Sequence, residues 1–245
     1  NRVTRLAEDG DFIWFVNWKA TTEGAIGRYN RGTEAFRFFS KEDLPLQPDA
    51  PPITLIHWIT VDEDVVWFGT NAGMLRYDKV SDTWQHYTTR DGLPNNEVWS
   101  ITLDSEYIWT LHVGGVVSRH LIKQNRWQNW EISPSAIWST LGAIAVDPQY
   151  VWVSTAWEGV KRFDKSTEEW QTFAERDGLG HSETNDIFID DDYVWITAWG
   201  DASRYDRRTE EWESLSDDRV FSNVTFGIHT GIDGLWMLYA WLNWG

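Results

Sequence analysis

The side chains that could carry acid–base or metal chemistry in this sequence are six histidines and 38 aspartates and glutamates. A histidine beside a carboxylate can move protons near neutral pH, and the two together can hold a divalent metal. The spacing favours neither chemistry, because no His-x-x-x-His pair, no paired histidine and carboxylate, and no nucleophile motif occurs. The histidines also stand at positions that are not equivalent to one another: His57, His86, His112, His120, His181 and His229.

Composition excludes further classes of site and partner. The chain has no cysteine, so it has no disulfide, thiolate metal ligand or cysteine nucleophile. Its 21 basic and 38 acidic residues give a net charge of −17, which repels nucleic-acid phosphates and anionic bilayers. No apolar run approaches the roughly 18 residues of a membrane span. We therefore expect no nucleic-acid partner and no membrane insertion by this segment.

Tryptophan residues recur with a period of about 42 residues, and this repeat indicates the elements that must position any site. Aliphatic-Trp pairs end at Trp14, Trp67, Trp109, Trp152, Trp195 and Trp236. An aspartate stands five residues before each of the first five, at Asp9, Asp62, Asp104, Asp147 and Asp190. An arginine follows, at Arg28, Arg76, Arg119, Arg162 and Arg204, and eight residues after each arginine stands an aromatic residue. Such self-similarity indicates a repeat fold.

Each repeat has the pattern of four short strands, A to D. In the third copy they read "EVWSITLD", "YIWTLHV", "GVVSRHL" and "RWQNWE", separated by turn residues. Strands A and B carry large apolar residues on both faces, so both faces must be covered. The sequence predicts an all-β fold, a β-propeller of four-stranded antiparallel blades with A innermost.

We expect a single domain over residues 1–245, with five complete blades and the A and B strands of a sixth, in a ring of six to eight blades. The predicted blades cover about 1–40, 53–89, 96–132, 139–174, 183–216 and, incompletely, 223–245. Because neither end of the sequence supplies the missing C and D strands, we expect that further residues of a longer protein, or a partner chain, complete the ring.

The repeated residues have structural roles in this scheme. The tryptophans are expected to fill the space between blades, because each buries about 150–250 Å². The arginines are expected to lie over D-strand aromatics or pair with carboxylates. The aspartates are expected to accept backbone N–H groups at the turn from A to B. Calcium is not expected, because the acidic stretches lack EF-hand spacing.

The stretches "VWFGTNAGMLRYD", "VWVSTAWEGVKRFD" and "VWITAWGDASRYD", with "RDGL" at Arg90–Leu93 and Arg176–Leu179, resemble the two-component regulator propeller repeat. The resemblance covers nearly the whole chain and is loosest in the first, third and sixth copies. It implies a bacterial propeller, often the extracytoplasmic sensor of a histidine kinase. It supplies no catalytic motif.

Function is expected where the copies differ, in loops at the mouth of the channel. The residues just after strand B are Trp18, Asn71, Val113, Trp157, Trp199 and Trp241. Four tryptophans there predict an aromatic ring suited to saccharide faces or to apolar side chains of a protein, or else packing over the blade tops. The connection Ser40–Thr54 either reaches over the mouth or forms an extended strap.

His57 and His229 fall in A strands, where they either approach the channel together or occupy separate core or loop positions. Trp58 and Trp99 are expected in the core. The predicted ligand-binding residues are Trp18, Asn71, Trp157, Trp199, Trp241 and His57. We expect a binding or sensing module for a saccharide or protein partner, with no catalytic residue, metal or cofactor. The alternatives are a structural subunit of a bacterial assembly and, with less support, a lyase or hydrolase at the channel mouth.

Overall fold

The structure, a computed structural model, describes residues 3–17, 26–40, 42–48, 50–121, 126–133, 142–215, 225–231 and 234–239. Residues 17 and 225–239 are described by their backbone alone. The chain forms two compact units, Asn1–Trp130 and Glu131–Gly245. None of the helices in these described ranges has the length and apolar character that a membrane span requires.

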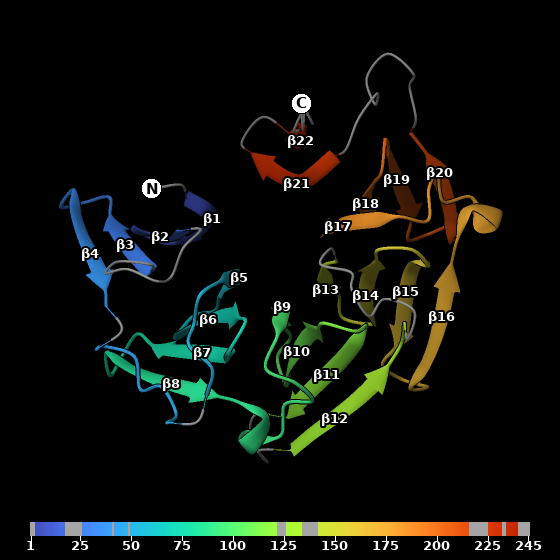
Figure 1. Cartoon of the computed structure of the whole chain (residues 1–245). Coiled ribbons are helices and arrows are strands. Elements are labelled where there is room, and N and C mark those ends of the chain that lie inside the picture. Colours follow the sequence, from blue (N-terminus) through green and yellow to red (C-terminus); the bar gives the residue numbers. More distant parts are fainter. Residues whose placement is uncertain are drawn as a thin grey trace, which may run out of the picture. The chain divides into compact units, whose positions relative to one another are not determined.

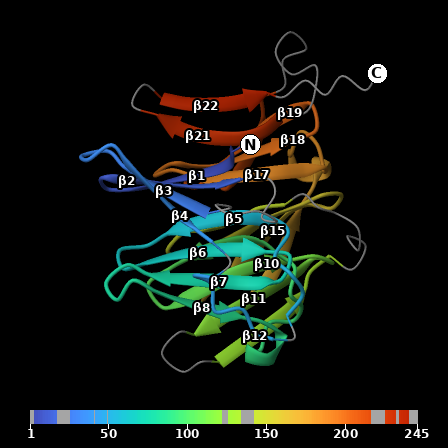
Figure 2. The same ribbon diagram turned by 60° about the vertical axis from the view of Figure 1, so that its left-hand side comes forward.

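Unit 1 contains three four-stranded antiparallel sheets, each with its strands in chain order (Figures 1 and 2). We call them blades 1 to 3. Blade 1 consists of β1 (Val3–Asp9), β2 (Phe12–Asn17), β3 (Ile26–Asn30) and β4 (Ala35–Phe39). Blade 2 consists of β5 (Ile56–Val61), β6 (Val65–Thr70), β7 (Gly73–Asp78) and β8 (Thr83–Tyr87). Blade 3 consists of β9 (Val98–Leu103), β10 (Tyr107–His112), β11 (Val116–Leu121) and β12 (Arg126–Glu131).

Unit 2 contains two further four-stranded antiparallel sheets and one two-stranded sheet. Blade 4 consists of β13 (Ile144–Val146), β14 (Tyr150–Thr155), β15 (Gly159–Asp164) and β16 (Glu169–Phe173). Blade 5 consists of β17 (Thr184–Ile189), β18 (Tyr193–Ala198), β19 (Asp201–Asp206) and β20 (Glu211–Ser214). The antiparallel pair is β21 (Thr225–Gly231) and β22 (Gly234–Tyr239). Five such sheets with almost no helix fit a β-propeller, as predicted.

Strand β6 shows why these residues form doubly covered strands. Successive side chains of a strand point to opposite faces. Val66 and Phe68 pack against blade 1, whereas Val65 and Trp67 pack against blade 3. Because both faces of β6 are buried, the strand contains no polar alternation and reads as a continuous apolar run.

The repeated tryptophans fill the space between blades, as predicted. Trp14 is fully buried, stacks on Phe39 of its own blade with ring centroids 5.6 Å apart, and meets Tyr77 of blade 2 edge-on at 5.1 Å. In unit 2, Trp152 repeats the arrangement with Phe173 at 6.1 Å and Tyr205 at 5.0 Å. Trp67 and Trp109 are also buried, Trp195 is partly buried, and the side chain of Trp236 lies outside the described residues.

The repeated aspartates do more than the sequence predicted. As expected, Asp147 Oδ1 accepts the backbone N–H of Tyr150 at 2.7 Å. Its second oxygen accepts the indole N–H of Trp152 at 3.1 Å, so each oxygen has its own task. The same indole bond joins Asp9 to Trp14, Asp104 to Trp109 and Asp190 to Trp195. The pair therefore satisfies a polar group that burial of tryptophan would otherwise leave unpaired.

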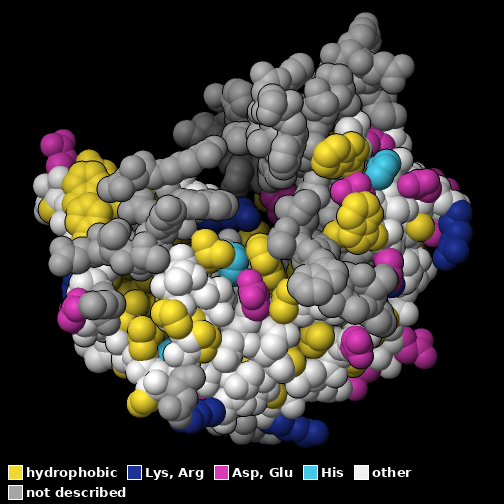
Figure 3. Space-filling model, in the orientation of Figure 1, with side chains coloured by type: hydrophobic (Ala, Val, Ile, Leu, Met, Phe, Trp, Pro, Cys, Tyr) yellow, Lys and Arg dark blue, Asp and Glu magenta, His cyan; other side chains and the backbone are white. Residues whose placement is uncertain are grey.

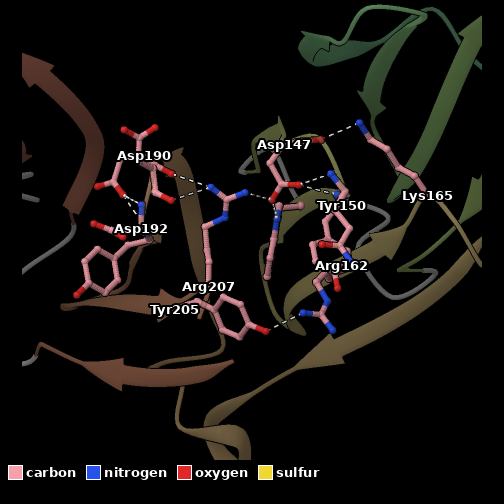
Figure 4. Close-up of polar contacts among 12 residues, drawn as sticks. Asp147, Tyr150, Arg162, Lys165, Asp190, Asp192, Tyr205 and Arg207 are labelled. Carbon is pink, nitrogen blue, oxygen red and sulfur yellow. Dashed lines mark hydrogen bonds and ion pairs between the residues drawn. The ribbon is translucent and has the colours of Figure 1, made fainter. Parts of the chain in front are cut away.

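Basic residues at the end of strand C link neighbouring blades through these aspartates. Arg207 of blade 5 lies 3.5 Å from Asp147 of blade 4 and also donates to the backbone oxygens of Asp190 and Asp191 (Figure 4). In unit 1, Lys79 of blade 2 contacts Asp9 of blade 1 at 2.6 Å. One carboxylate thus contacts both the tryptophan of its own blade and a basic residue of the next blade.

The repeated arginines lie over aromatic rings, as predicted. Arg162 is 5.1 Å from the ring of Phe173 in strand D and 4.3 Å from that of Tyr150 at the start of strand B, a contact the sequence did not predict. It also donates to Gln171 of strand D at 2.7 Å. Two of the copies also pair with carboxylates: Arg76 with Asp78 at 3.0 Å and Arg204 with Glu213 at 2.7 Å.

The D-strand aromatic of blade 1 departs from the pattern. Phe36 is 62% exposed, and Phe38 beside it is 57% exposed. Within unit 1, blade 1 packs against blade 2 through its Trp14 face, and these phenylalanines lie on the opposite face with Phe15. The equivalent aromatic of blade 2, Trp84, packs against the blade 1 cluster. The exposure of Phe36 therefore follows from its place at the end of unit 1.

Candidate ligand-binding face

Two of the tryptophans predicted to bind a ligand stand exposed in unit 2. Trp157 lies in the turn from β14 to β15 and is 62% exposed, and Trp199 lies in the turn from β18 to β19 and is 51% exposed. Each therefore follows strand B of its blade, as the sequence predicted. An exposed indole keeps a large apolar face in water, which is unusual for a residue that contributes so much area to packing.

A single segment of chain joins the two turns. The backbone oxygen of Ser182 accepts the N–H of Gly159 at 2.8 Å, and that of the next residue, Glu183, accepts the N–H of Trp199 at 2.9 Å. The buried hydroxyl of Thr184 bonds Thr155 at the base of the first turn. Since consecutive Cα atoms are about 3.8 Å apart, this path keeps the Cα atoms of the two tryptophans within roughly 25 Å of each other. We call Trp157, Trp199, residues 180–184 and Asp201 the tryptophan face.

Asp201 brings a buried carboxylate to the tryptophan face. It is 6% exposed, and its oxygens accept the Ala202 N–H at 2.5 Å and the Ser214 hydroxyl at 3.0 Å. Burial raises the pKa of Asp201, and the two hydrogen bonds oppose that rise. A Cβ added to Gly180 would lie 1.5 Å from its Oδ2, so the carboxylate lies directly against the loop before β17.

Asp201 was not singled out by the sequence analysis, although a signal was present. The strand C stretches read "GMLRYD", "GVKRFD" and "DASRYD", so Asp201 stands where blades 2 and 4 have Gly73 and Gly159. At Gly159 an added Cβ would lie 2.1 Å from the backbone oxygen of Phe173, which explains the glycine there. Blades 1 and 3 have Ala25 and Val116 there, so an alignment of the copies would have identified Asp201 as the charged residue at this position.

Histidine and acidic residues occur in the turns and the loop that form the tryptophan face. His181 Nδ1 accepts the Glu183 N–H at 3.0 Å, and the electrostatic influence of His181 reaches Asp201. Next to Trp157, Glu158 accepts from Ser133 at 2.9 Å and from Lys161 at 2.9 Å. Figure 3 shows hydrophobic side chains among acidic and histidine side chains over β17 to β19. Aromatic faces beside hydrogen-bonding groups can bind a ligand by stacking and by polar contacts together.

Asn71 has a different environment from the two tryptophans. In unit 1, its side-chain oxygen accepts the N–H groups of Thr54 and Leu55, both at 2.9 Å, and its amide donates to the backbone oxygen of Pro52. These bonds hold the connection between blades 1 and 2 against the β6–β7 turn. The side chain thus has a structural task, and its use for a ligand stays a prediction.

The connection after blade 1 is an extended strap along blade 2. Gln47 donates to the backbone oxygen of His86 and to Asp91, and accepts from Thr88 at 2.8 Å. His86 in turn accepts the Gln47 N–H at Nδ1 and contacts the Ala72 oxygen through Nε2 at 2.8 Å. Of the two arrangements expected for Ser40–Thr54, the connection therefore has that of an extended strap.

His57 lies on β5 of unit 1, stacked on Trp99 of β9 with ring centroids 4.0 Å apart. Arg5 of β1 donates to the His57 backbone oxygen at 3.3 Å and lies over Trp58. The His57 Nε2 is 3.5 Å from Glu97 Oε1, beyond a good hydrogen bond. Burial, and then the charge of Arg5, lowers the pKa of His57 to about 4, so the ring is neutral at pH 7.

His112 and His120 have structural surroundings. His112 is buried and contacts the Thr110 hydroxyl at 2.8 Å, and burial lowers its pKa to about 3. His120 stacks on Trp127 at 4.2 Å, as Tyr77 and Tyr205 pack on the tryptophans of their own D strands. The predicted residues Trp18 and Trp241, and the side chain of His229, lie outside the described residues.

The candidate residues therefore fall into two sets. Unit 2 brings Trp157 and Trp199 together, whereas Asn71 and His57 belong to unit 1. Among the residues that the structure describes, no group of three or more histidines, aspartates and glutamates is arranged to hold a metal ion. The tryptophan face is thus the strongest candidate for a binding site.

The chain matches no protein-family model and no curated protein. It is similar to solved structures of much longer proteins. The extracellular domain of the putative hybrid two component system BT3049 from B. thetaiotaomicron shares 20% identity at a TM-score of 0.79, over 97% of this chain and 32% of that one. The extracellular domain of the putative one component system BT4673 from the same organism shares 18% identity at a TM-score of 0.72, over 97% of this chain and 34% of that one.

A third similar structure is PorZ, a bacterial surface component of the type-IX secretion system of Porphyromonas gingivalis. It shares 13% identity at a TM-score of 0.60, over 80% of this chain and 30% of that one. At these identities the likeness shows a common fold. The chain spans about a third of the length of the structures it matches.

Proposed function

We propose that this chain is a non-catalytic binding or sensing β-propeller of a bacterial protein, placed outside the cytoplasm, which presents the tryptophan face to a saccharide. The observation that carries the proposal is the contrast between the tryptophans of unit 2. Trp152, at the repeated position, is fully buried, whereas Trp157 and Trp199, just past strand B, are 62% and 51% exposed. Packing between blades explains Trp152, whereas Trp157 and Trp199 remain exposed and can contact a ligand.

The chemistry of the face supports a saccharide in particular. A sugar ring has an apolar face that stacks on an indole, and hydroxyl groups at its edge that need hydrogen-bond partners. Carboxylates accept hydrogen bonds from such hydroxyls, and a neutral imidazole can accept with one nitrogen and donate with the other. The tryptophan face combines two indoles with Asp201, Glu183 and His181.

The comparisons support the cellular setting of this proposal. Two of the similar structures are extracellular domains of putative signalling systems, and their resemblance to this chain extends over 97% of it. The proposal includes a sixth blade, begun by β21 and β22, and a ring of six to eight blades. An extracytoplasmic place agrees with the resemblance of the repeat to sensor propellers.

A glycan array, followed by calorimetric titration of the ligands it identifies, tests the proposal. Calorimetry suits this chain because its 19 tryptophans would mask the fluorescence of two. Trp157→Ala and Trp199→Ala should each weaken binding by about fivefold or more, since the loss of an aromatic platform costs about 1–3 kcal/mol. Both variants should unfold at the wild-type denaturant concentration, because the side chains are exposed.

The matched control is Phe36→Ala, which removes an aromatic ring of equal exposure from unit 1 and should leave the affinity unchanged. The proposal fails if no glycan binds, or if the two tryptophan variants bind as tightly as the wild-type protein.

A further inference from the structure

The charges around the tryptophan face are unbalanced. The segments that build its surroundings, residues 155–161, 174–184 and 198–203, contain five carboxylates and two basic side chains. The acidic ones are Glu158, Glu175, Asp177, Glu183 and Asp201, and the basic ones are Lys161 and Arg176. Charges of one sign gathered in one place set up a potential that attracts or repels ligands.

Both basic side chains already have acidic partners within these segments. Lys161 Nζ is 2.9 Å from Glu158, with the lysine side chain 12% exposed. Arg176 lies 3.6 Å from Asp177, which precedes the loop to β17. Positive charge close to the face is therefore largely compensated, and an arriving carboxylate or sulfate would have to compete with these pairs.

The remaining carboxylates belong to residues that build the site of Trp199. Glu183 holds the backbone of Trp199 through its carbonyl oxygen, and Asp201 follows Trp199 by two residues. Glu175 accepts the Ser182 N–H at 3.1 Å and thereby positions the same loop. A ligand stacked on Trp199 would therefore lie close to several negative charges, and a negative ligand would be disfavoured.

The two indoles also constrain the length of a ligand. Each indole offers a platform for a single sugar ring, and the platforms lie on two different blades joined by residues 182–184. A ligand that uses both platforms must extend from one turn to the other. Two modest contacts joined in one ligand give a much higher affinity than either alone.

We infer that the tryptophan face selects uncharged oligosaccharides and discriminates against uronate-bearing or sulfated oligosaccharides of the same length. Here the carboxylates do two things: they accept hydrogen bonds from sugar hydroxyls, and they repel acidic sugars. This inference rests on the proposed saccharide function, which it makes more specific.

The test compares matched neutral and acidic oligosaccharides with the full chain. The array carries neutral tetrasaccharides together with the uronate of the same backbone and linkage, such as β-1,4-mannotetraose and β-1,4-tetramannuronate, and calorimetry measures each binder. The dissociation constant for the acidic member should exceed that of its neutral match by at least about tenfold at low salt. The ratio should fall as salt is raised from about 0.05 M to about 0.5 M, because the repulsion is screened.

Two variants that each remove one negative charge distinguish repulsion of an acidic ligand by the tryptophan face from repulsion by the whole protein. Glu183→Gln should lower the preference for the neutral ligand by about threefold or more, because Glu183 lies in the loop beside Trp199. Glu211→Gln is the control: it removes the same charge from the first residue of β20, which pairs with Asp206 at the end of β19 away from Asp201, and should leave the preference unchanged.

The outcomes are distinguishable. An acidic oligosaccharide that binds as tightly as its neutral match, or a preference that neither salt nor Glu183→Gln alters, overturns the inference and leaves the saccharide function standing. If no oligosaccharide of either kind binds, the proposed function falls, and this inference falls with it.

Discussion

At the scale of single residues, the main stabilising device is the aspartate that stands five residues before a buried tryptophan. A buried indole gains from its large apolar area but carries an N–H group that must find an acceptor. Asp147 supplies the acceptor for Trp152 while it also caps the turn and contacts Arg207. One carboxylate thus joins turn, core and neighbouring blade.

This role predicts that two equivalent aspartates, Asp147 and Asp62, contribute unequally to the free energy of unfolding. Asp147→Ala leaves the Trp152 indole and the Tyr150 N–H without these partners, so we expect a loss of about 2–4 kcal/mol in the free energy of unfolding. Asp62→Ala is the control, because the indole of Trp67 has no hydrogen-bond partner among the residues that the structure describes. It should cost less than about 1 kcal/mol by urea denaturation. Equal losses in the two variants would contradict this role.

His57 predicts a pH dependence of stability. Its folded-state pKa of about 4 lies below the ordinary 6.5, so between these values the unfolded chain binds a proton that the folded protein does not. The neutral histidine therefore favours folding fully above pH 6.5, and stability falls as the pH falls toward 4. The fall attributable to His57 is up to about 3 kcal/mol, less whatever Glu97 restores by pairing with the charged ring.

The measurement is urea denaturation of the wild-type protein and His57→Gln over that pH range. The advantage of the wild-type protein should shrink steadily as the pH falls, because the other histidines titrate in both proteins and cancel. A constant difference between the two proteins would show that His57 keeps its ordinary pKa.

At the scale of elements, the strands were the most predictable part of the chain. The third copy illustrates this, because its four predicted stretches correspond to β9, β10, β11 and β12. Strand identity depends on local patterns, namely doubly apolar runs bounded by turn residues, and a single sequence carries those. The indole bond of Asp147 was missed because it needs the register of β13 on β14, which brings the turn and Trp152 together.

The candidate site was predictable only in part, for a similar reason. Trp157 and Trp199 could be found from their equivalent places after strand B. The structural role of Asn71 could not be found in this way, because it depends on the path of a connection that begins more than 15 residues earlier. The exposure of Phe36 depends on the absence of a neighbouring blade within unit 1, which no local pattern encodes.

The strap between blades 1 and 2 gives a prediction at this scale. Asn71→Ala removes the acceptor of the Thr54 and Leu55 N–H groups, so hydrogen exchange at these two residues should quicken by about tenfold, corresponding to about 1–2 kcal/mol. Asn71→Asp keeps the acceptor and loses only the donor to Pro52. Mass-detected exchange should therefore place it between the alanine variant and the wild-type protein. Unchanged exchange in both variants would show that the strap is held elsewhere.

At the scale of the whole molecule, tryptophan is used in two ways. In each unit the repeated residues, such as Trp14 and Trp152, are buried between sheets and give the repeats their cohesion. Trp157 and Trp199 add nothing comparable to the core, yet both stand in one region of unit 2, tied together by residues 182–184. The net charge of −17 makes the chain as a whole repel acidic ligands.

The central claim is that these two exposed indoles form one binding surface for a sugar chain. A crystal structure of the full chain with the tightest-binding neutral oligosaccharide tests it most directly. We expect two sugar rings of one chain to stack on Trp157 and Trp199, with hydroxyls hydrogen-bonded near Glu183 and Asp201. A ligand bound elsewhere on the protein, with both indoles still in solvent, would contradict it.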